Sequence, residues 1–230
     1  MAGLMRVIKY RFSFPHGSNY LTNHPYFHPF KFYSNNAVQK GSPSPITANV
    51  LRLIRNEIEN LVDLTPPYQP WNSHELFVVN DRASQQWISL KKSLGETEEL
   101  DLEATMFDGM KTVYRDGNDD NLLHITLVVR ISKRSYSENR PLEFLCSAWP
   151  NRLEIHKVYF ASSCDDKLEA TYSGRDFRQL KWEIQVHLRM LLEEKGVNGQ
   201  LCSFLHYYML NKDKIELLNW FQKLHAFLER

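Results

Sequence analysis

The chain has 230 residues, 43% of them hydrophobic and 13% aromatic, which suffices for the core of one ordinary domain and excludes a chain disordered throughout. No apolar run approaches the roughly 20 residues needed to span a bilayer. Three scattered cysteines, Cys146, Cys164 and Cys202, have the spacing of neither a disulfide framework nor a zinc site, so a reducing compartment is expected.

The formal net charge of +1 conceals an asymmetry between the first 45 residues and the rest. Residues 1–45 contain five of the 28 Lys and Arg residues and no acid, whereas the remainder has 23 basic and 27 acidic residues, a net charge of −4. A basic, acid-free segment rich in Ser, Asn and aromatic residues is typical of an organelle transit peptide; a tail that lacks acids by chance is the alternative. The sequence therefore predicts a transit peptide and linker over residues 1–45, with the cleavage point left open, and a folded domain over residues 46–230.

The first predicted element is an amphipathic helix over residues 46–64, with apolar residues three and four apart. The helix should end at TPPYQP, Thr65 to Pro70, because prolines cannot donate backbone hydrogen bonds. Its apolar stripe consists of Val50, Leu53, Ile54, Ile58, Leu61 and Val62.

Six strand-like runs follow with turn-rich links and no helices between them, which predicts an antiparallel meander. The clearest is LLHITLVVRIS, where Leu123 and Ile125 begin one face and His124 and Thr126 the other, so one face is buried and one at least partly wet. The predicted strands are Glu75–Asn80, Gln85–Lys91, Glu99–Phe107, Leu122–Ser132, Leu142–Trp149 and Leu153–Phe160.

After Asp165 the apolar spacing becomes helical, with Ser173 and Asp176 resembling a capping box. Gly196 is suited to a left-handed helix C-terminus. A second helical region extends from about Gly199 to Glu229, either straight or bent near Asn211. One helix, six or seven strands and two long helices predict an α+β domain whose sheet is covered on one face.

Catalytic constellations are sparse. Nucleotide-binding glycine motifs, zinc-protease motifs and serine-hydrolase motifs are absent from the sequence. Glu183 and His187, four apart on a helix, favour a solvated pair over two metal ligands. His124 and His156 with Cys146 between them could supply a base and a nucleophile, but the strand periodicity favours Cys146 as a small sheet residue. We expect no cofactor and no metal.

The segment Gly95 to Asn121 contains nine acidic and two basic residues, a local net charge of −7. Such a strand pair can attract basic partners, and a solvated hairpin whose charges only keep a sheet edge soluble is the equal alternative. The sparse basic residues near Arg130 do not favour sequence-specific nucleic-acid binding. The candidate partner-binding acids are Glu98, Glu99, Asp101, Asp119 and Asp120.

Three stretches carry a family resemblance: DFRQLKWEIQVHLRMLLEEKGV, FLHYYMLNKDKIELLNWFQKLHAFL and LEFLCSAWPNRLEIHKVYF. They resemble the two last helices and a strand pair of the mitochondrial glycoprotein family, or mitochondrial acidic matrix protein family, whose animal member binds complement. The resemblance covers about residues 46–230. It implies a twisted antiparallel sheet of about seven strands flanked by one N-terminal and two C-terminal helices, assembled as a ring-shaped homotrimer.

The resemblance further implies a non-enzymatic mitochondrial matrix protein with a docking or chaperone-like role in organelle gene expression: RNA processing, ribosome assembly or translation. Its clients would be basic proteins or ribonucleoproteins, although this chain is only mildly acidic for the family. The last helix is apolar around most of its circumference, so Trp220, Phe221, Leu224 and Phe227 are expected at a subunit interface, with burial inside a monomer as the alternative. A small-ligand carrier or enzyme using the sheet face around His124 and His156 is the alternative function.

Overall fold

The computed structural model describes residues 44–230 except 65–66, 69–72, 75–76, 116–117, 135–139 and 162–173, and leaves out the side chains of 64, 73, 113–115 and 118–120 as well. The described residues belong to one compact unit, Pro43–Arg230.

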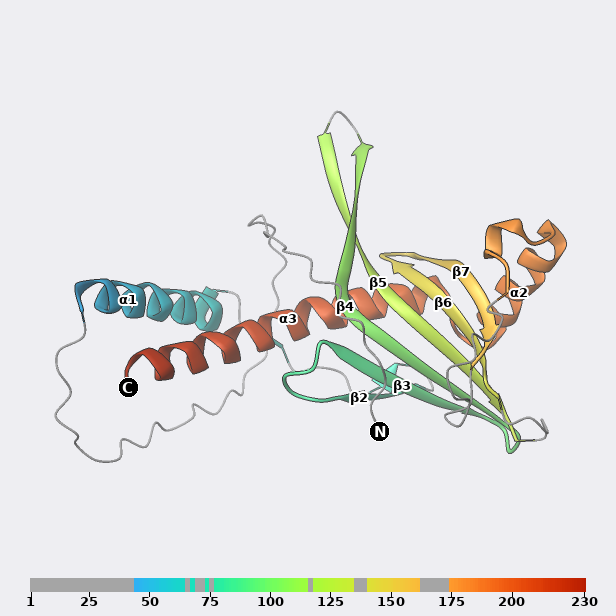
Figure 1. Ribbon diagram of the computed structural model, residues 1–230, viewed down its shortest axis with the longest axis horizontal. Helices are drawn as coiled ribbons and strands as arrows, with labels where there is room; N and C mark the ends of the chain where they lie inside the picture. Colours follow the sequence, from blue (N-terminus) through green and yellow to red (C-terminus); the bar gives the residue numbers. More distant parts are fainter. Residues whose placement is uncertain are drawn as a thin grey trace. The chain divides into compact units, whose positions relative to one another are not determined.

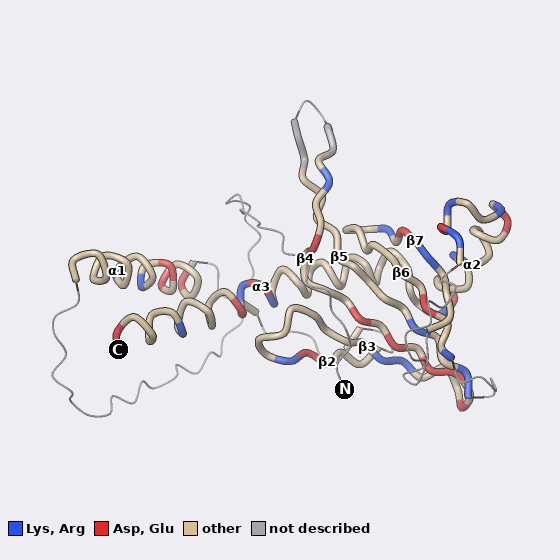
Figure 2. Tube along the Cα trace, in the orientation of Figure 1, with Lys and Arg blue, Asp and Glu red and all other residues tan. Residues whose placement is uncertain are grey.

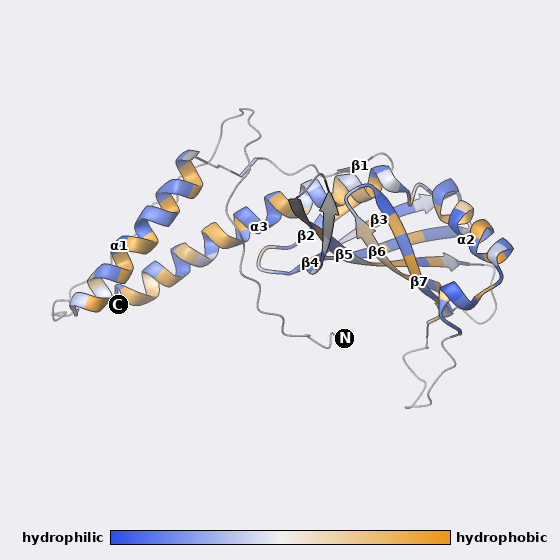
Figure 3. Cartoon of the chain, turned by 90° about the horizontal axis from the view of Figure 1, so that it is seen from above, coloured by the Kyte–Doolittle hydropathy of each residue, from blue (hydrophilic) through white to orange (hydrophobic). Residues whose placement is uncertain are grey.

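The first helix, α1 (Pro45–Glu59), continues into a π-helical turn, η1 (Asn60–Leu64), which confirms the predicted amphipathic helix. It begins where it does because the Ser44 hydroxyl accepts a hydrogen bond from the Thr47 amide at 3.1 Å, and because Pro45 lacks an amide that would need a partner. Ile54 is the one α1 side chain that is buried. The helix lies along the C-terminal half of the last helix (Figures 1 and 3).

The strands form one antiparallel meander in which every strand pairs with its neighbours in sequence, as predicted (Figure 1). Among the described residues there are seven strands, six of them five residues or longer and one of only two residues. They are β1 (Ser73–His74), β2 (Phe77–Asp81), β3 (Trp87–Leu94), β4 (Glu98–Arg115), β5 (Asn118–Lys133), β6 (Leu142–Trp149) and β7 (Arg152–Phe160).

The core lies on one face of this sheet. Alternate side chains of the central strands are fully buried there, for example Leu100 and Leu102 on β4 and Ile125 and Leu127 on β5. Leu205 and its buried neighbours on the last helix pack against them. The opposite face, called the open face below, carries the intervening and mostly polar residues, so the strict alternation predicted for LLHITLVVRIS is confirmed.

Strands β4 and β5 extend further than predicted and form a hairpin beyond the sheet (Figure 1). The register shifts at Phe107 and Gly109, so that β4 has two more residues than β5 between the pairs Ala104–Leu127 and Gly109–His124. β3 pairs no further than Thr105 of β4, and β6 no further than Ile125 of β5. Beyond that point the two strands pair only with each other. Because the described residues of the hairpin beyond Phe107 do not pack on the core, its sequence lacks the alternation of apolar and polar residues that would have predicted strands.

The segment after β7 differs from the prediction at its start. Asp176 caps a short 3₁₀-helix, η2 (Phe177–Gln179), by accepting a hydrogen bond from the Arg178 amide at 3.1 Å. Leu180 is then extended, so the main helix, α2 (Trp182–Glu194), begins six residues after Asp176. The capping-box interpretation was therefore wrong for α2, and Ser173 lies outside the described residues.

The end of α2 is as predicted. Gly196 adopts φ 88°, and the Val197 amide donates to the Leu192 carbonyl at 2.8 Å while the Gly196 amide donates to Glu193 at 2.9 Å. The last helix, α3 (Gly199–Leu228), follows and runs 30 residues without interruption, through Asn211. Asn198 caps it through hydrogen bonds from the Gln200 and Leu201 amides.

Candidate functional site

The open face of the sheet carries a row of alternating charges that crosses five strands. Each strand from β3 to β7 contributes one residue to the row, and each of these residues is the register partner of the next. In strand order they are Lys91, Asp101, Arg130, Glu143 and Tyr159. The Lys91 ammonium is 3.0 Å from the Asp101 carboxylate, and Arg130 Nε is 2.5 Å from Glu143 Oε1. Residues directly opposite on one face interact most strongly, so this row fixes the register of the sheet as well as its charge.

Arg130 is the centre of this charged row. Its two terminal nitrogens donate to both oxygens of Glu103, at 2.9 and 3.3 Å, while Nε binds Glu143. These bonds raise the pKa of Arg130, with Glu103 the largest cause, and they keep the guanidinium charged at every accessible pH. Burial, followed by the Glu143 charge, raises the pKa of Tyr159 to about 12, so its hydroxyl stays protonated.

The row neutralises much of the acidity that the sequence suggested for β4. Asp101 and Glu103 each have a basic partner, and along the same face only Glu99 is exposed with no ion pair in the described part of the chain. Figure 2 shows acidic residues at intervals along β4, separated by uncharged ones. The open face is therefore polar and weakly acidic rather than densely negative.

Glu98 has a different role from the other candidate acids. Its carboxylate lies 2.7 Å from the Lys195 ammonium, with only 18% and 12% of the two side chains exposed. Lys92 donates to the Lys195 carbonyl at 2.8 Å. Together these contacts attach the turn between α2 and α3 to the sheet, so the Glu98 carboxylate is occupied within the chain.

Asp119 and Asp120 lie near the tip of the hairpin, opposite Tyr114 and Val113 on β4. Their side chains are outside the described part of the structure. The structure thus places Glu99 and Asp101 on the open face, the Asp119–Asp120 pair at the end of the hairpin, and Glu98 in a structural ion pair. The five predicted residues do not form one cluster around a single point.

The histidines of the alternative function lie away from Cys146. Cys146 faces the core with 1% of its surface exposed, and burial raises the pKa of its thiol, so it is a sheet residue as the periodicity indicated. His156 hydrogen-bonds instead to Ser147 on the open face, Nε2 to Oγ 2.7 Å. His124 packs on Trp149, and its Nδ1 is 3.5 Å from Asp108, too long for a hydrogen bond.

The Ser147–His156 contact pairs a hydroxyl with a base, the first requirement of a nucleophile. Glu154 is nearby, but its two oxygens accept from Trp149 Nε1 at 2.9 Å and from Arg178. These bonds lower the pKa of Glu154, Trp149 being the largest cause, and hold the carboxylate away from a hydrogen bond to the imidazole. Neither the cavity beside Asp81 nor the one beside Asn151 includes Ser147 in its lining.

The Glu183–His187 pair lies on the exposed face of α2. His187 Nδ1 donates to the Glu183 backbone carbonyl at 2.7 Å, so this ring nitrogen is hydrogen-bonded within its own helix. Within the described residues, no group of three or more His, Cys, Asp or Glu side chains is arranged to hold a metal ion.

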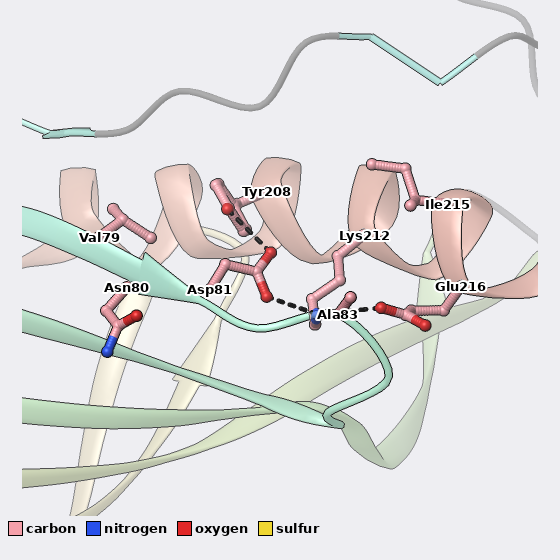
Figure 4. A pocket seen from close by; sticks show the side chains of 8 residues that line it. All are labelled: Val79, Asn80, Asp81, Ala83, Tyr208, Lys212, Ile215 and Glu216. Atoms are coloured by element: carbon pink, nitrogen blue, oxygen red, sulfur yellow. Dashed lines mark hydrogen bonds and ion pairs between the residues drawn. The ribbon is translucent and has the colours of Figure 1, made fainter. Parts of the chain in front are cut away.

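Sequence reasoning missed a polar cluster where α3 meets the turn between β2 and β3 (Figure 4). The Lys212 ammonium, with 3% of the side chain exposed, is 2.6 Å from Asp81 Oδ1 and 3.5 Å from Glu216 Oε1. Tyr208 donates to Asp81 Oδ2 at 3.0 Å, and the Ser84 amide donates to Glu216 at 2.8 Å. Residues 205, 208, 212 and 216 follow the buried helical spacing, which is the signal that could have identified Lys212 as an inward-facing charge.

Asn211, next to Lys212, holds another part of the chain. With 1% of its surface exposed, it accepts from the Tyr68 amide at 2.8 Å and donates to the Tyr68 carbonyl at 3.0 Å. The Tyr68 ring stacks on Tyr207, with centroids 4.7 Å apart. The consecutive residues Asn211 and Lys212 thus attach α3 to the segment after η1 and to the sheet.

The predicted interface residues lie on the C-terminal half of α3, which has few fully buried side chains. Trp220 and Phe227 are 54% and 74% exposed, whereas Phe221 and Leu224 are half-buried. α1 adds further exposed apolar residues beside them, including Ile46 at 78%. The exposed apolar side chains of the two helices are called the helical surface below; they are Ile46, Val50, Leu53, Leu217, Trp220 and Phe227. Figure 3 shows hydrophobic residues interspersed with hydrophilic ones along both helices.

An antiparallel meander with one N-terminal and two C-terminal helices, an open polar face and no long apolar helix defines an α+β domain of a recognisable class. No helix in the described residues has the length and hydropathy required to cross a membrane. Residues 54–228 match the family model described as mitochondrial glycoprotein (MAM33), and the chain belongs to that family. This confirms the resemblance drawn from the three quoted stretches.

Individual relatives agree. The mitochondrial acidic protein mam33 of Schizosaccharomyces pombe is 31% identical over 101 residues, a match that covers 40% of this chain and 38% of that relative's length. The crystal structure of the Trypanosoma brucei p22 protein has a TM-score of 0.64 at 18% identity and covers 80% of this chain and all of its own. A Leishmania major protein of unknown function, described as a sequence homologue of human p32, has a TM-score of 0.60 at 19% identity over 79% of this chain and 98% of its own. At these identities the two structures show the fold alone.

Proposed function

We propose that this chain is a non-enzymatic protein of the mitochondrial matrix that docks basic protein or ribonucleoprotein clients. By this docking or chaperone-like activity it supports organelle gene expression: RNA processing, ribosome assembly or translation. The observation that carries the proposal is the open face of the sheet, polar, uncovered by any described helix and bearing the exposed acid Glu99. Membership of the mitochondrial glycoprotein family supports the mitochondrial part.

The docking surface extends from the open face toward the tip of the hairpin. Glu99 and Asp101 provide carboxylates along β4, and Asp119 and Asp120 add two more at the hairpin. Attraction of this kind brings basic partners together over distances of about a Debye length, roughly 8 Å at physiological ionic strength. Glu98 contributes indirectly by fixing the α2–α3 turn through Lys195.

Client capture from mitochondrial extract tests this function. Changing Glu99, Asp101, Asp119 and Asp120 to their amides should reduce capture several-fold. The melting temperature should stay within about 2 °C, because Glu99 is exposed and the Lys91–Asp101 pair, open to solvent on the lysine side, contributes little to folding. The matched control changes Glu193 and Glu194, on the last turn of α2, to Gln. Capture that ignores both the amide changes and added salt would show that clients bind elsewhere or not at all.

Two further parts of the proposal concern targeting and assembly. We propose that residues 1–45 direct import and that residues 46–230 form the mature domain; a fluorescent fusion of residues 1–45 should enter mitochondria, and a diffuse cytosolic signal would refute this. We also propose that three copies associate through the helical surface into a ring. Light scattering that gives the mass of one chain would refute the trimer.

The Ser147–His156 hydrogen bond supports a second candidate, an enzyme or small-ligand carrier using the open face near His124 and His156. A hydroxyl 2.7 Å from an imidazole is a geometry that favours nucleophilic attack. A fluorophosphonate probe should label Ser147 in the native protein but not in His156→Ala if this candidate is right. An unlabelled native protein excludes a serine nucleophile at this position.

A further inference from the structure

A cavity of about 350 Å³ lies between the C-terminal end of β2 and the middle of α3 (Figure 4). Val79, Ala83 and Ile215 provide apolar walls, while Asp81, Lys212 and Glu216 provide the charged ones. The charged groups come from two segments separated by about 130 residues in the sequence, and the Lys212 side chain is almost completely buried. The cavity includes none of the charged residues of the open face, because the side chains of Lys91, Asp101 and Arg130 are not part of its lining.

The carboxylate oxygens around the cavity are unequally occupied. Asp81 Oδ1 accepts from Lys212 and Oδ2 accepts from Tyr208. Glu216 Oε1 accepts from the Ser84 amide and faces Lys212 at 3.5 Å. Within the described residues Glu216 Oε2 has no donor, so one carboxylate oxygen of the lining is available.

The charge of the lining is also unbalanced. Two carboxylates face a single ammonium, and burial weakens the screening that solvent would provide. Lys223 contacts the same turn through Ser84 Oγ at 3.2 Å but does not line the cavity. One further cationic group with hydrogen-bond donors would balance the charge of the lining.

The shape of the lining selects among cations. A free metal ion would leave the apolar walls of Val79, Ala83 and Ile215 unused. An arginine side chain matches both parts, because its aliphatic stem can pack on these walls while its guanidinium, with five N–H donors, reaches the free oxygen of Glu216.

We propose that this cavity is a specific subsite for an arginine side chain of a partner protein, with Glu216 as the residue that accepts the guanidinium. The inference rests on the proposed docking of basic clients and adds a defined anchor to the diffuse attraction of the open face. In this arrangement the acids of the open face govern how fast a client arrives, and the cavity governs how long it stays.

The experiment uses the full chain and two short peptides that differ in one group. The first is acetylated and amidated with a single arginine among serines, and the second has citrulline, the uncharged counterpart of similar shape, in place of arginine. NMR titration follows the amide of Ser84, which reports directly on Glu216. The arginine peptide should shift this amide in a saturable way, and the citrulline peptide should not.

A variant then assigns the acceptor. Glu216→Gln keeps an oxygen for the Ser84 amide and for Lys212 but removes the charge, so the fold should persist while the arginine peptide binds about tenfold more weakly, as for one partly exposed charge-assisted hydrogen bond. Glu194→Gln, an exposed acid at the end of α2, is the matched control and should bind the peptide like the native chain.

The results separate the subsite from the docking function. Equal binding of arginine and citrulline peptides, or unchanged binding by Glu216→Gln, overturns the subsite. Absence of any peptide shift, together with salt-sensitive capture of basic clients, also overturns the subsite and leaves docking intact. If the native chain captures no basic clients, docking is refuted, and the peptide titration still decides whether the cavity takes an arginine.

Discussion

Gly109 determines how the β4–β5 hairpin leaves the sheet. A Cβ at this position would lie 1.7 Å from Nε2 of His124, the residue opposite it on β5. The imidazole therefore rests directly on the glycine backbone. At the same bulge the Thr126 amide is bound by the Asp108 carboxylate at 3.0 Å and the Thr105 hydroxyl at 3.1 Å, so the distortion leaves this donor satisfied.

Gly109→Ala should therefore destabilise the chain by about 1–3 kcal/mol, because the added methyl group must displace the His124 ring. Urea denaturation measures the loss. Adding His124→Ala should recover part of it, since the smaller side chain makes room. Losses that simply add in the double variant would show that the clash is not the cause.

His206 makes stability depend on pH. It is buried on α3, its Nε2–H donates to the Ala148 carbonyl at 2.9 Å, and its ring is 5.4 Å from that of Phe107. Burial, together with the nearby His124, lowers the pKa of His206. The folded state then binds a proton less readily than the unfolded state, whose histidine pKa is about 6.5.

The stabilising contribution of neutral His206 is accordingly present above pH of about 6.5 and is lost as the pH falls below that value. Urea midpoints at pH 7.5 and 5.5 should differ in this direction. His206→Gln, whose amide can still donate to Ala148, should reduce the difference, and the exposed His187→Gln should not. An equally steep pH dependence in His206→Gln would assign the effect to another group.

At the scale of elements, the contact between α3 and the β2–β3 turn depends on a buried charge. Lys212→Met removes the ion-pair partner of Asp81 and the ammonium that faces Glu216. Breaking a buried pair is costly, and because the two carboxylates are 25% and 20% exposed and can be partly rehydrated, we expect a loss of about 2–3 kcal/mol.

Adding Asp81→Asn to Lys212→Met should recover about 1 kcal/mol, because the unpaired carboxylate is removed. Lys91→Met, whose ion pair with Asp101 is 67% exposed on the lysine side, is the control and should cost less than about 1 kcal/mol. Similar losses for the two lysine variants in urea denaturation would contradict a special role for the buried pair.

The elements best predicted from sequence are those with one buried and one solvent-exposed face. Ile125, Leu127 and Val129 are fully buried and alternate with the partly exposed Thr126, Val128 and Arg130, so β5 was evident. The hairpin beyond Phe107 was not, because it has no core to face. The start of α2 was missed because Phe177 and Leu180 fit helical spacing, although Leu180 is extended.

The candidate site was less predictable for a related reason. The net charge of a segment can be calculated from its sequence, but the ion-pair partners of its residues cannot, because they lie in other segments. Here Glu98 binds Lys195, and Arg130 binds Glu103 and Glu143. The net charge of −7 around β4 therefore exaggerated the acidity of the open face. Lys212 lies on a predicted helix of mostly apolar residues, and its partner Asp81, 131 residues away, makes it part of the interior.

At the scale of the whole molecule, the helical surface and the open face differ in how far their side chains have partners within the chain. The open face pairs most of its charges within the chain, whereas Trp220 and Phe227 are exposed without a described covering. Asp213, on the same helix, has its pKa raised by burial alone. In the proposed trimer a neighbouring subunit would cover the aromatic rings and could supply a donor to Asp213.

The proposed trimer predicts a selective effect of surface substitutions. Trp220→Ser and Phe227→Ser should leave each subunit folded, because both rings are more than half exposed within one chain, yet should lower the assembled fraction. Each ring removed from an interface forfeits about 2 kcal/mol of apolar burial, and a closed ring loses this at every interface. Trp182→Ser on α2, where the ring is 68% exposed, is the matched control and should not change the mass in solution. Light scattering over a range of concentrations measures the mass, and far-ultraviolet circular dichroism verifies the fold. If the double variant keeps the native mass at all concentrations, the helical surface is not the interface, whatever the oligomeric state proves to be.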